Sequence, residues 1–337
     1  METGIPQVMG KEFAMRSLLR LLSCVFLILI VTTTAFAQQA EIAKFPSKPI
    51  TFIIPFPPGG SSDLGCRLIC REAEKYLGQP VIVLNKPGAG GAIGVAAVAA
   101  SKPDGYTVGM CHGQALFILP FLENLPYNAV KDFRYLLQFV ALSFGVVVKA
   151  DSLFKSFAEL IAYARANPKK VTYGTNSPNS ISRIIVEQIA AKEKVELTHI
   201  PFKGSPEYQA ALLGGHIMFT AGEFIYPTIE AGQARILLFL GEKGLPEFPQ
   251  VPTLKDLGFD IPTPLFNNVA GPKGIPDEIA RKLEDAFTKA MKEPAFIKGM
   301  KELHFSIFYR NSKEMTDYIM FNYEIFPKIL KQMGLVK

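Results

Sequence analysis

Residues 50–63 read ITFIIPFPPGGSSD and combine three signals in one short stretch. Residues 50–54 are β-branched or aromatic throughout, which predicts a buried strand. The prolines and glycines that follow predict a turn, and Ser62 or Asp63 supplies an N-cap for a helix that runs to Leu77. A strand, a tight turn and a helix in this order are the start of an α/β fold.

The same alternation of short strands and helices continues along the chain. Strands are expected at residues 81–84 and 107–110, with a helix at 92–100 between them. A second series begins near Gly145, with strands expected at 146–148, 171–173, 197–200, 217–221 and 236–240 and helices at 157–166, 182–192 and 207–213. The pattern predicts parallel sheets built from right-handed crossovers.

The two series predict two domains, as the length of 337 residues also suggests. The proline-rich stretch 245–264 is a connection back to the first series, followed by a strand at 267–270 and a helix at 276–291. We therefore expect two Rossmann-like α/β lobes around a cleft. The first lobe is discontinuous and contains residues 45–145 and 266–337, and the second contains residues 146–265.

Two glycine-rich turns of the first lobe have the composition of an anion site. Residues 56–63 follow the first expected strand, and residues 87–94 follow the second. The carboxyl ends of strands in an α/β sheet are where ligands bind, and free N–H groups at a helix N-terminus attract anions. Either loop alone could be an ordinary capped turn, but two on neighbouring strands favour a shared anion site. Residues 173–182 form a similar small polar loop in the second lobe.

The N-terminal segment has the features of a secretory signal peptide. Arg16 and Arg20 precede an apolar run at residues 21–31, and Ala35-Phe36-Ala37 precedes two glutamines. We expect residues 1–37 to be removed after Ala37, which would place the mature chain in the periplasm. Met15 could equally be the true start, and the sequence leaves this open.

Composition argues against several other classes of protein. The formal charge is +6, but the basic residues are scattered, so no nucleic-acid partner is expected. Three cysteines remain after cleavage, Cys66, Cys70 and Cys111, and an odd number argues against a disulfide framework. Cys66 and Cys70 lie on one apolar face of the expected helix, so we expect them to be buried. The four histidines have no metal-ligand spacing, and we expect neither a metal nor a cofactor.

Two enzyme motifs are incomplete, and we expect that the protein is not an enzyme. Ile93 stands where a dinucleotide-binding Gly-x-Gly-x-x-Gly motif needs its third glycine. Ser152 and Lys155 fit the Ser-x-x-Lys motif of periplasmic serine acyltransferases, but Ser152 precedes the expected helix and the third motif of that class is missing. Acyl transfer or hydrolysis therefore remains only as an alternative.

The chain resembles the solute-binding receptors of the tripartite tricarboxylate transporter family, which include the Bug proteins. The resemblance begins with FPSKPI at 45–50, PFPPGGSSD at 55–63, LGQPV at 77–81 and NKPGAGG at 85–91. It continues through PDGYT at 103–107, LPY at 125–127, KDF at 131–133, PFKG at 201–204, LGG at 213–215 and VPT at 251–253. These motifs keep the order and spacing of the family from Phe45 to near the C-terminus.

The resemblance implies a periplasmic binding protein of the type II, or Venus flytrap, architecture that holds a small carboxylate. The implied partners are one large and one small integral membrane subunit of a transporter, and we expect a monomeric receptor. A receptor that presents its ligand to a membrane sensor kinase is the alternative. In the first lobe, the resemblance implies ligand binding by Phe56, Gly59, Gly60, Ser61, Ser62, Asp63, Gly90, Gly91 and Gly94.

The second lobe departs from the family pattern, and its residues are assigned more loosely. Arg183 stands where histidine is common, and Glu223 comes one position after the place of a family aspartate, which Gly222 occupies. Arg183 could pair with a second carboxylate or be an exposed helical arginine. The residues expected to contact the ligand here are Thr175, Asn176, Ser177, Ser180 and Glu223. The identity of the carboxylate does not follow from the sequence.

Overall fold

The computed structural model describes residues 42–142, 144–224, 226–241 and 243–336. The expected signal peptide of residues 1–37 lies outside the described residues. All helices and strands named below belong to one compact unit, residues 48–337.

The first of two sheets has six strands in the order β11-β4-β10-β3-β1-β2. β1 pairs in parallel with β2 and β3, as expected from the sequence, but β10 runs antiparallel to β3 and β4, and β11 antiparallel to β4. The sheet is therefore mixed, and the expectation of a purely parallel sheet is wrong. The strands are β1 (Ile50–Ile54), β2 (Val81–Asn85), β3 (Thr107–Gly109), β4 (Phe133–Ala141), β10 (Phe266–Pro272) and β11 (Ser306–Arg310).

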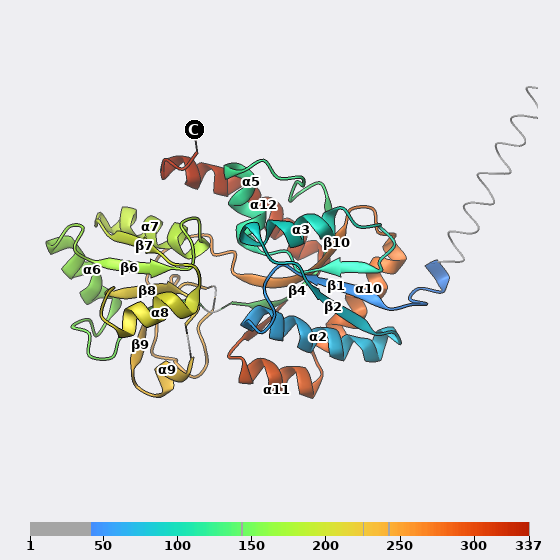
Figure 1. Ribbon diagram of the computed structural model, residues 1–337, viewed down its shortest axis with the longest axis horizontal. Coiled ribbons are helices and arrows are strands. Elements are labelled where there is room, and N and C mark those ends of the chain that lie inside the picture. Colours follow the sequence, from blue (N-terminus) through green and yellow to red (C-terminus); the bar gives the residue numbers. More distant parts are fainter. Residues whose placement is uncertain (1–41, 143, 225, 242, 337) are drawn as a thin grey trace, which may run out of the picture. The chain divides into compact units, whose positions relative to one another are not determined.

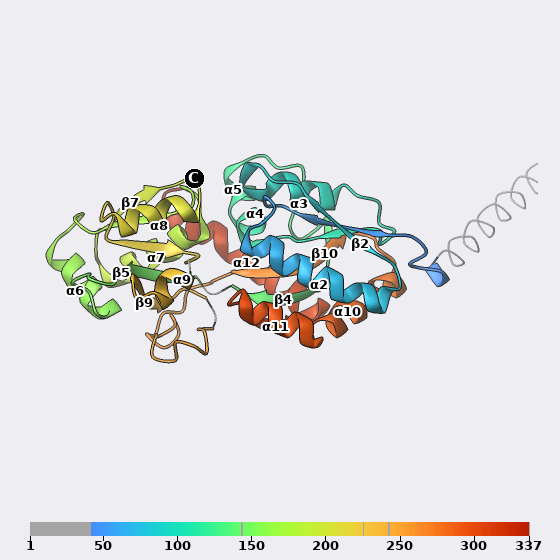
Figure 2. The ribbon, with the colours of Figure 1, turned by 60° about the horizontal axis from the view of Figure 1, so that its bottom comes forward.

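Helices cover both faces of this sheet (Figures 1 and 2). One face carries α2 (Ser61–Leu77), α10 (Asp277–Ala290) and α11 (Pro294–Glu302). The other face carries α3 (Ala92–Ala99), α4 (Gly113–Phe117), α5 (Leu119–Leu122) and α12 (Ser312–Gln332).

The second sheet has five strands in the order β7-β6-β8-β5-β9. β6 pairs in parallel with β7 and β8, whereas β5 is antiparallel to β8 and β9. The strands are β5 (Gly145–Lys149), β6 (Thr172–Thr175), β7 (Thr198–Pro201), β8 (Phe219–Gly222) and β9 (Ala234–Phe239). The helices are α6 (Phe157–Ala166), α7 (Ile181–Glu193), α8 (Ser205–Leu213) and α9 (Tyr226–Glu230).

The chain passes from the first sheet to the second after β4 and returns with β10 (Figure 1). The strands of the first sheet thus come from both ends of the compact unit, and those of the second from its middle. The residues at which one lobe ends and the other begins stay a prediction.

Large aromatic side chains fill the space between sheets and helices. Phe52 of β1 packs against Phe287 of α10 with ring centroids 6.1 Å apart, and Phe117 of α4 stacks on Phe326 of α12 at 5.6 Å. All four rings are fully buried, and burial of one such side chain contributes about 1.5–3 kcal/mol to folding. Cys66 and Cys70 are buried on α2, as the spacing predicted, and their burial raises the pKa of both thiols.

Candidate anion site

The ends of β1, β2 and β3 meet at one edge of the first sheet. Because these strands are parallel neighbours, the loops that leave their carboxyl ends lie side by side. Residues 55–60 follow β1, residues 86–91 follow β2, and residues 110–112 follow β3. The edge therefore brings together both glycine-rich loops and a third loop that contains Cys111 and His112.

The first loop ends at the exposed N-terminus of α2. Gly60 is the N-cap residue with φ −74°, and no side chain caps the helix. The expected caps, Ser62 and Asp63, already lie inside the helix, so that expectation is wrong. Gly59 and Gly60 are exposed and Ser61 and Ser62 are half-buried, so the N–H groups of a 17-residue helix face the open end of the loop.

Asp63 stabilises this loop from inside. Its buried carboxylate accepts hydrogen bonds from the Gly59 N–H at 2.9 Å, the Asn85 amide at 2.7 Å and the Arg67 guanidinium at 2.9 Å. Burial raises the pKa of Asp63, but the bonds from Arg67, Asn85 and Gly59 outweigh it, and the net pKa is lowered. Asp63 is thus a charged carboxylate whose hydrogen bonds connect the first loop with Asn85 of β2 and Arg67 of α2.

The second loop owes its shape to glycine. Gly88, Gly90 and Gly91 have φ of 127°, 59° and 90°, conformations that side chains disfavour. A Cβ at Gly91 would lie 2.1 Å from Nε2 of His112, so this position has no room for a side chain. The turn leads directly into α3, whose N-cap, Gly91, has no side-chain bond either.

Gly94 is buried in the first turn of α3 and faces the protein. A Cβ there would lie 2.7 Å from Cα of Pro55 and 2.8 Å from the carbonyl oxygen of Lys86. Gly94 therefore allows α3 to approach the ends of β1 and β2, which places the N-terminus of α3 beside the first loop. Its role in the structure is this packing, and its ligand-binding role stays a prediction.

His112 is the residue of this edge that the sequence analysis missed. Its ring lies 4.7 Å from the ring of Phe56 and against Gly91, so it contacts both glycine-rich loops. Burial lowers the pKa of His112 to about 4, although a hydrogen bond with the Gly90 backbone opposes the shift, and the ring is neutral at pH 7. The available signal was topological: His112 follows β3, the third parallel strand that ends at this edge.

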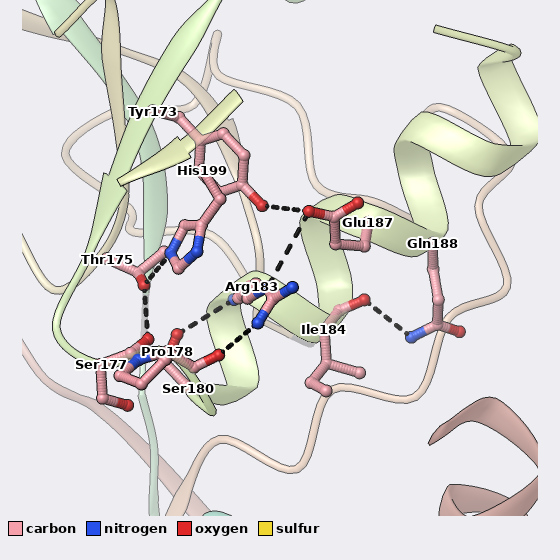
Figure 3. Close-up of polar contacts among 10 residues, drawn as sticks. All are labelled: Tyr173, Thr175, Ser177, Pro178, Ser180, Arg183, Ile184, Glu187, Gln188 and His199. Carbon is pink, nitrogen blue, oxygen red and sulfur yellow. Dashed lines mark hydrogen bonds and ion pairs between the residues drawn. The ribbon is translucent and has the colours of Figure 1, made fainter. Parts of the chain in front are cut away.

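The second sheet presents a polar loop after β6 (Figure 3). Thr175 is buried, and its hydroxyl donates to the carbonyl of Ser177 at 2.9 Å and bonds Nε2 of His199 at 2.8 Å. Ser180 caps α7 by accepting the N–H of Arg183. Ser177 is half-buried and Asn176 is exposed, so Asn176 is the freest of the four predicted residues in this loop.

Arg183 braces the same loop (Figure 3). Its guanidinium donates to the carbonyl of Pro178 at 2.7 Å and lies 3.9 Å from the carboxylate of Glu187. Glu187 also accepts a hydrogen bond from Tyr173 at 2.7 Å. Arg183 thus has protein partners on both sides, and its position fits loop support better than pairing with a second carboxylate.

Glu223 links the two sheets. It follows β8, and its carboxylate accepts hydrogen bonds from Ser61 of α2 and, at 3.4 Å, from Ser205 of α8. Its backbone carbonyl accepts from the Tyr208 hydroxyl and from Gln209. The carboxylate therefore lies at the first turns of two helices, where the helix dipoles favour a negative charge.

The described part of the chain lacks the residue groupings of other site classes. In residues 42–142, 144–224, 226–241 and 243–336, no group of three His, Cys, Asp or Glu side chains is arranged to hold a metal ion. The same part of the chain has no helix with the length and apolar character of a membrane span. Ser152 and Lys155 both precede α6, so the two side chains lie in a loop and not on one helix.

Comparison with known proteins gives consistent matches. The model of the tripartite tricarboxylate transporter family receptor matches residues 66–335. A protein of Cupriavidus necator, named for the gbd 5' region, is 39% identical over 90% of this chain and 93% of its own length. A TctC solute-binding protein from Polaromonas has a TM-score of 0.75 at 27% identity, covering 86% of this chain and 99% of that one. MatC from Rhodopseudomonas palustris, solved with malate, shares the fold, with a TM-score of 0.71 at 23% identity over 85% of this chain and 100% of that one.

Proposed function

The chain belongs to the tripartite tricarboxylate transporter receptor family, and from this we propose that it captures a small carboxylate between its two lobes in the periplasm. The observation that carries the proposal is the convergence of two uncapped helix N-termini, those of α2 and α3, at one sheet edge. The backbone N–H groups in the first turn of α2 and the close backbone approach at the glycines suit a carboxylate, and so do the Ser61 and Ser62 hydroxyls, which now donate to Glu223 and Asn267.

We assign the carboxylate to the first lobe and the rest of the ligand to the second. The carboxylate would be surrounded by Gly59, Gly60, Ser61, Ser62, Gly90 and Gly91. Phe56 and His112 would pack beside it, and Asp63 and Gly94 would hold the two loops in position. Asn176 and Ser177 would contact the distal part of the ligand, positioned by Thr175 and Ser180. Glu223 would lie beside the carboxylate, at the first turn of α2. Only closure of the lobes completes these contacts, so ligand favours the closed state.

The biological role follows from the family. We propose that the mature receptor begins after Ala37, is monomeric and hands its ligand unchanged to one large and one small membrane subunit. The lobes would comprise residues 45–145 with 266–337, and 146–265. Binding without turnover is what we propose, because the donors assigned to the carboxylate are backbone N–H groups and hydroxyls, and the Glu223 carboxylate beside Ser61 is shared with Ser205.

A thermal-shift screen of purified residues 38–337 tests the carboxylate assignment. The panel contains acetate, benzoate, succinate, malate, adipate, glutamate and citrate. A ligand at a hundred times its Kd stabilises the folded state by about 2.7 kcal/mol, so a binder raises Tm. Chemical analysis of the ligand after long incubation should recover it intact, and conversion to a product would contradict the receptor role.

Two variants locate the site in the same screen. Gly60→Asp and Gly91→Asp place a negative charge at each glycine-rich loop, and both should abolish the shift. Because Gly91 has no room for a side chain, its variant is used only if its far-UV spectrum is native. If no panel member raises Tm of the folded, ligand-free wild type, the carboxylate assignment is wrong.

A further inference from the structure

Strand β10 carries two consecutive asparagines into the edge where the anion site lies. Asn267 and Asn268 are both fully buried at the start of β10, next to the end of β3. A register shift against β4 falls between them. Two neighbouring residues of this strand thus present amide groups close to the loops that leave β1 and β3.

The two amides have different partners. Oδ1 of Asn268 accepts the backbone N–H of Cys111 at 2.8 Å, which fixes the loop after β3. Oδ1 of Asn267 accepts a long hydrogen bond of 3.4 Å from the hydroxyl of Ser62, in the first turn of α2. Asn267 is therefore the side chain that lies directly beneath the uncapped N-terminus of α2.

The amide nitrogen of Asn267 has no hydrogen-bond partner within the described part of the chain, although it is fully buried. Nδ2 of Asn268 and Nε2 of His112 share this condition at the same edge. Buried polar atoms are nearly always paired, and an unpaired buried donor calls for a partner such as a water, an ion or a ligand. Nδ2 of Asn267, next to the first turn of α2, can donate a hydrogen bond to an anion bound there.

Ser62 connects this amide to the first turn of α2. Its side chain is half-buried, and its hydroxyl contacts Oδ1 of Asn267. At 3.4 Å this hydrogen bond is long, and a ligand carboxylate is a stronger acceptor for the same hydroxyl. A carboxylate bound to the first turn of α2 then has Nδ2 of Asn267 as its next donor, on the side away from solvent.

We propose that Asn267 is a ligand-binding residue whose amide donates a hydrogen bond to the carboxylate at the first turn of α2. This inference rests on the proposed function and deepens it, because it assigns a contact on β10. β10 is the strand on which the chain returns from the second sheet (Figure 1). A ligand bound there contacts both a helix N-terminus and the strand that connects the lobes.

Asn267→Asp tests the contact with minimal change of shape. The carboxylate keeps the acceptor for Ser62 but replaces the donor by a negative charge. We expect the Kd for the tightest-binding member of the panel to rise about tenfold or more at pH 7.5, measured by titration calorimetry. Asn322→Asp is the matched control, since Asn322 is also fully buried but lies on α12; its Kd should stay within twofold of the wild type.

The pH dependence separates this contact from a structural effect. At pH 5 a buried aspartic acid at position 267 gains a proton and can donate again, so the ratio of variant to wild-type Kd should fall. Asp63 and Glu223 at the first turn of α2, and Cys111 and His112 after β3, are present in both proteins, so their effects largely cancel in the ratio. A ratio near one at pH 7.5 in a folded variant overturns the inference.

Wild-type protein provides a second test if Asn267→Asp does not fold. The side-chain amide resonances of Asn267, assigned in ¹⁵N-labelled protein, should shift on saturation with the same ligand, whereas those of Asn322 should not. Unshifted Asn267 resonances with a bound ligand overturn this inference alone. A panel without any binder overturns the proposed function, and this inference with it.

Discussion

Gly94 and Gly60 are both glycines of the candidate site, but their surroundings differ. A Cβ at Gly94 would overlap the backbone of Pro55 and Lys86, whereas at Gly60 the nearest atom is 4.0 Å away and φ is −74°. We expect Gly94→Ala to lower the free energy of unfolding by about 1–3 kcal/mol and Gly60→Ala, which only weakens an N-cap, to lower it by less than about 1 kcal/mol. Urea unfolding measures both. Equal effects would contradict the packing role of Gly94.

His112 should make stability depend on pH. Its folded pKa of about 4 lies below the ordinary value of 6.5, so the unfolded chain takes up a proton first as the pH falls. The stability is fully present above pH 6.5 and is lost between pH 6.5 and 4, by up to about 1.4 kcal/mol per pH unit. His199, whose pKa burial also lowers to about 4, acts in the same direction.

Two variants isolate the contribution of His112. His112→Asn should flatten the plot of the free energy of unfolding against pH between 6.5 and 4, whereas His216→Asn, at an exposed position, should not. An unchanged slope in His112→Asn would show that this ring is not held neutral by burial.

At the residue scale, the sequence predicted the chemistry of the loops better than the role of each side chain. The glycines and serines after β1 and β2 predicted an anion site, and the structure brings the two loops to one sheet edge. Asp63 was expected to cap the helix, but the helix starts before it, so its carboxylate pairs with Arg67 one turn later and bonds Asn85, which comes within reach only in the fold. His112 and Asn267 come to the edge through β3 and β10, and local sequence does not specify that pairing.

At the scale of elements, the helix N-termini of α2 and α8 share one carboxylate, that of Glu223. This side chain occupies the first turn of α2 that the proposal gives to the ligand. We expect Glu223→Gln to strengthen binding of dicarboxylates about fivefold, because it removes a negative charge beside the ligand. Calorimetry with succinate and adipate measures this effect. Glu230→Gln, exposed at the end of α9, is the control and should leave both Kd values unchanged.

The predicted strands and helices agree with the structure where the residues of the element itself carry the signal, such as an apolar run or an N-cap. The strand at residues 50–54 and the helix at 157–166 were predicted at their observed bounds. β4, β11 and α12 were not predicted. The nine residues of β4 are almost all buried, so they lack the alternation that identifies a half-exposed strand. The antiparallel direction of β10 depends on the return of the chain from the second sheet, which local patterns do not encode.

At the scale of the molecule, ring and hydrogen-bond contacts connect the two lobes. Ser61 bonds Glu223, and the ring of Tyr226 on α9 stacks on His304, which precedes β11. Both contacts lie close to the candidate site. Ligand binding and lobe closure should therefore be coupled, since the ligand enters beside the same helix turn that Glu223 contacts.

The central claim is that the site holds a carboxylate by its charge and its two oxygens. Calorimetric comparison of the tightest-binding acid of the panel with its primary amide, on wild-type residues 38–337, tests this directly. The amide keeps the shape but lacks the negative charge and one acceptor oxygen. We predict that the acid binds at least about a hundredfold more tightly, a difference of about 2.7 kcal/mol. An amide that binds as tightly as the acid would contradict the assignment of an anion site to the turns of α2 and α3.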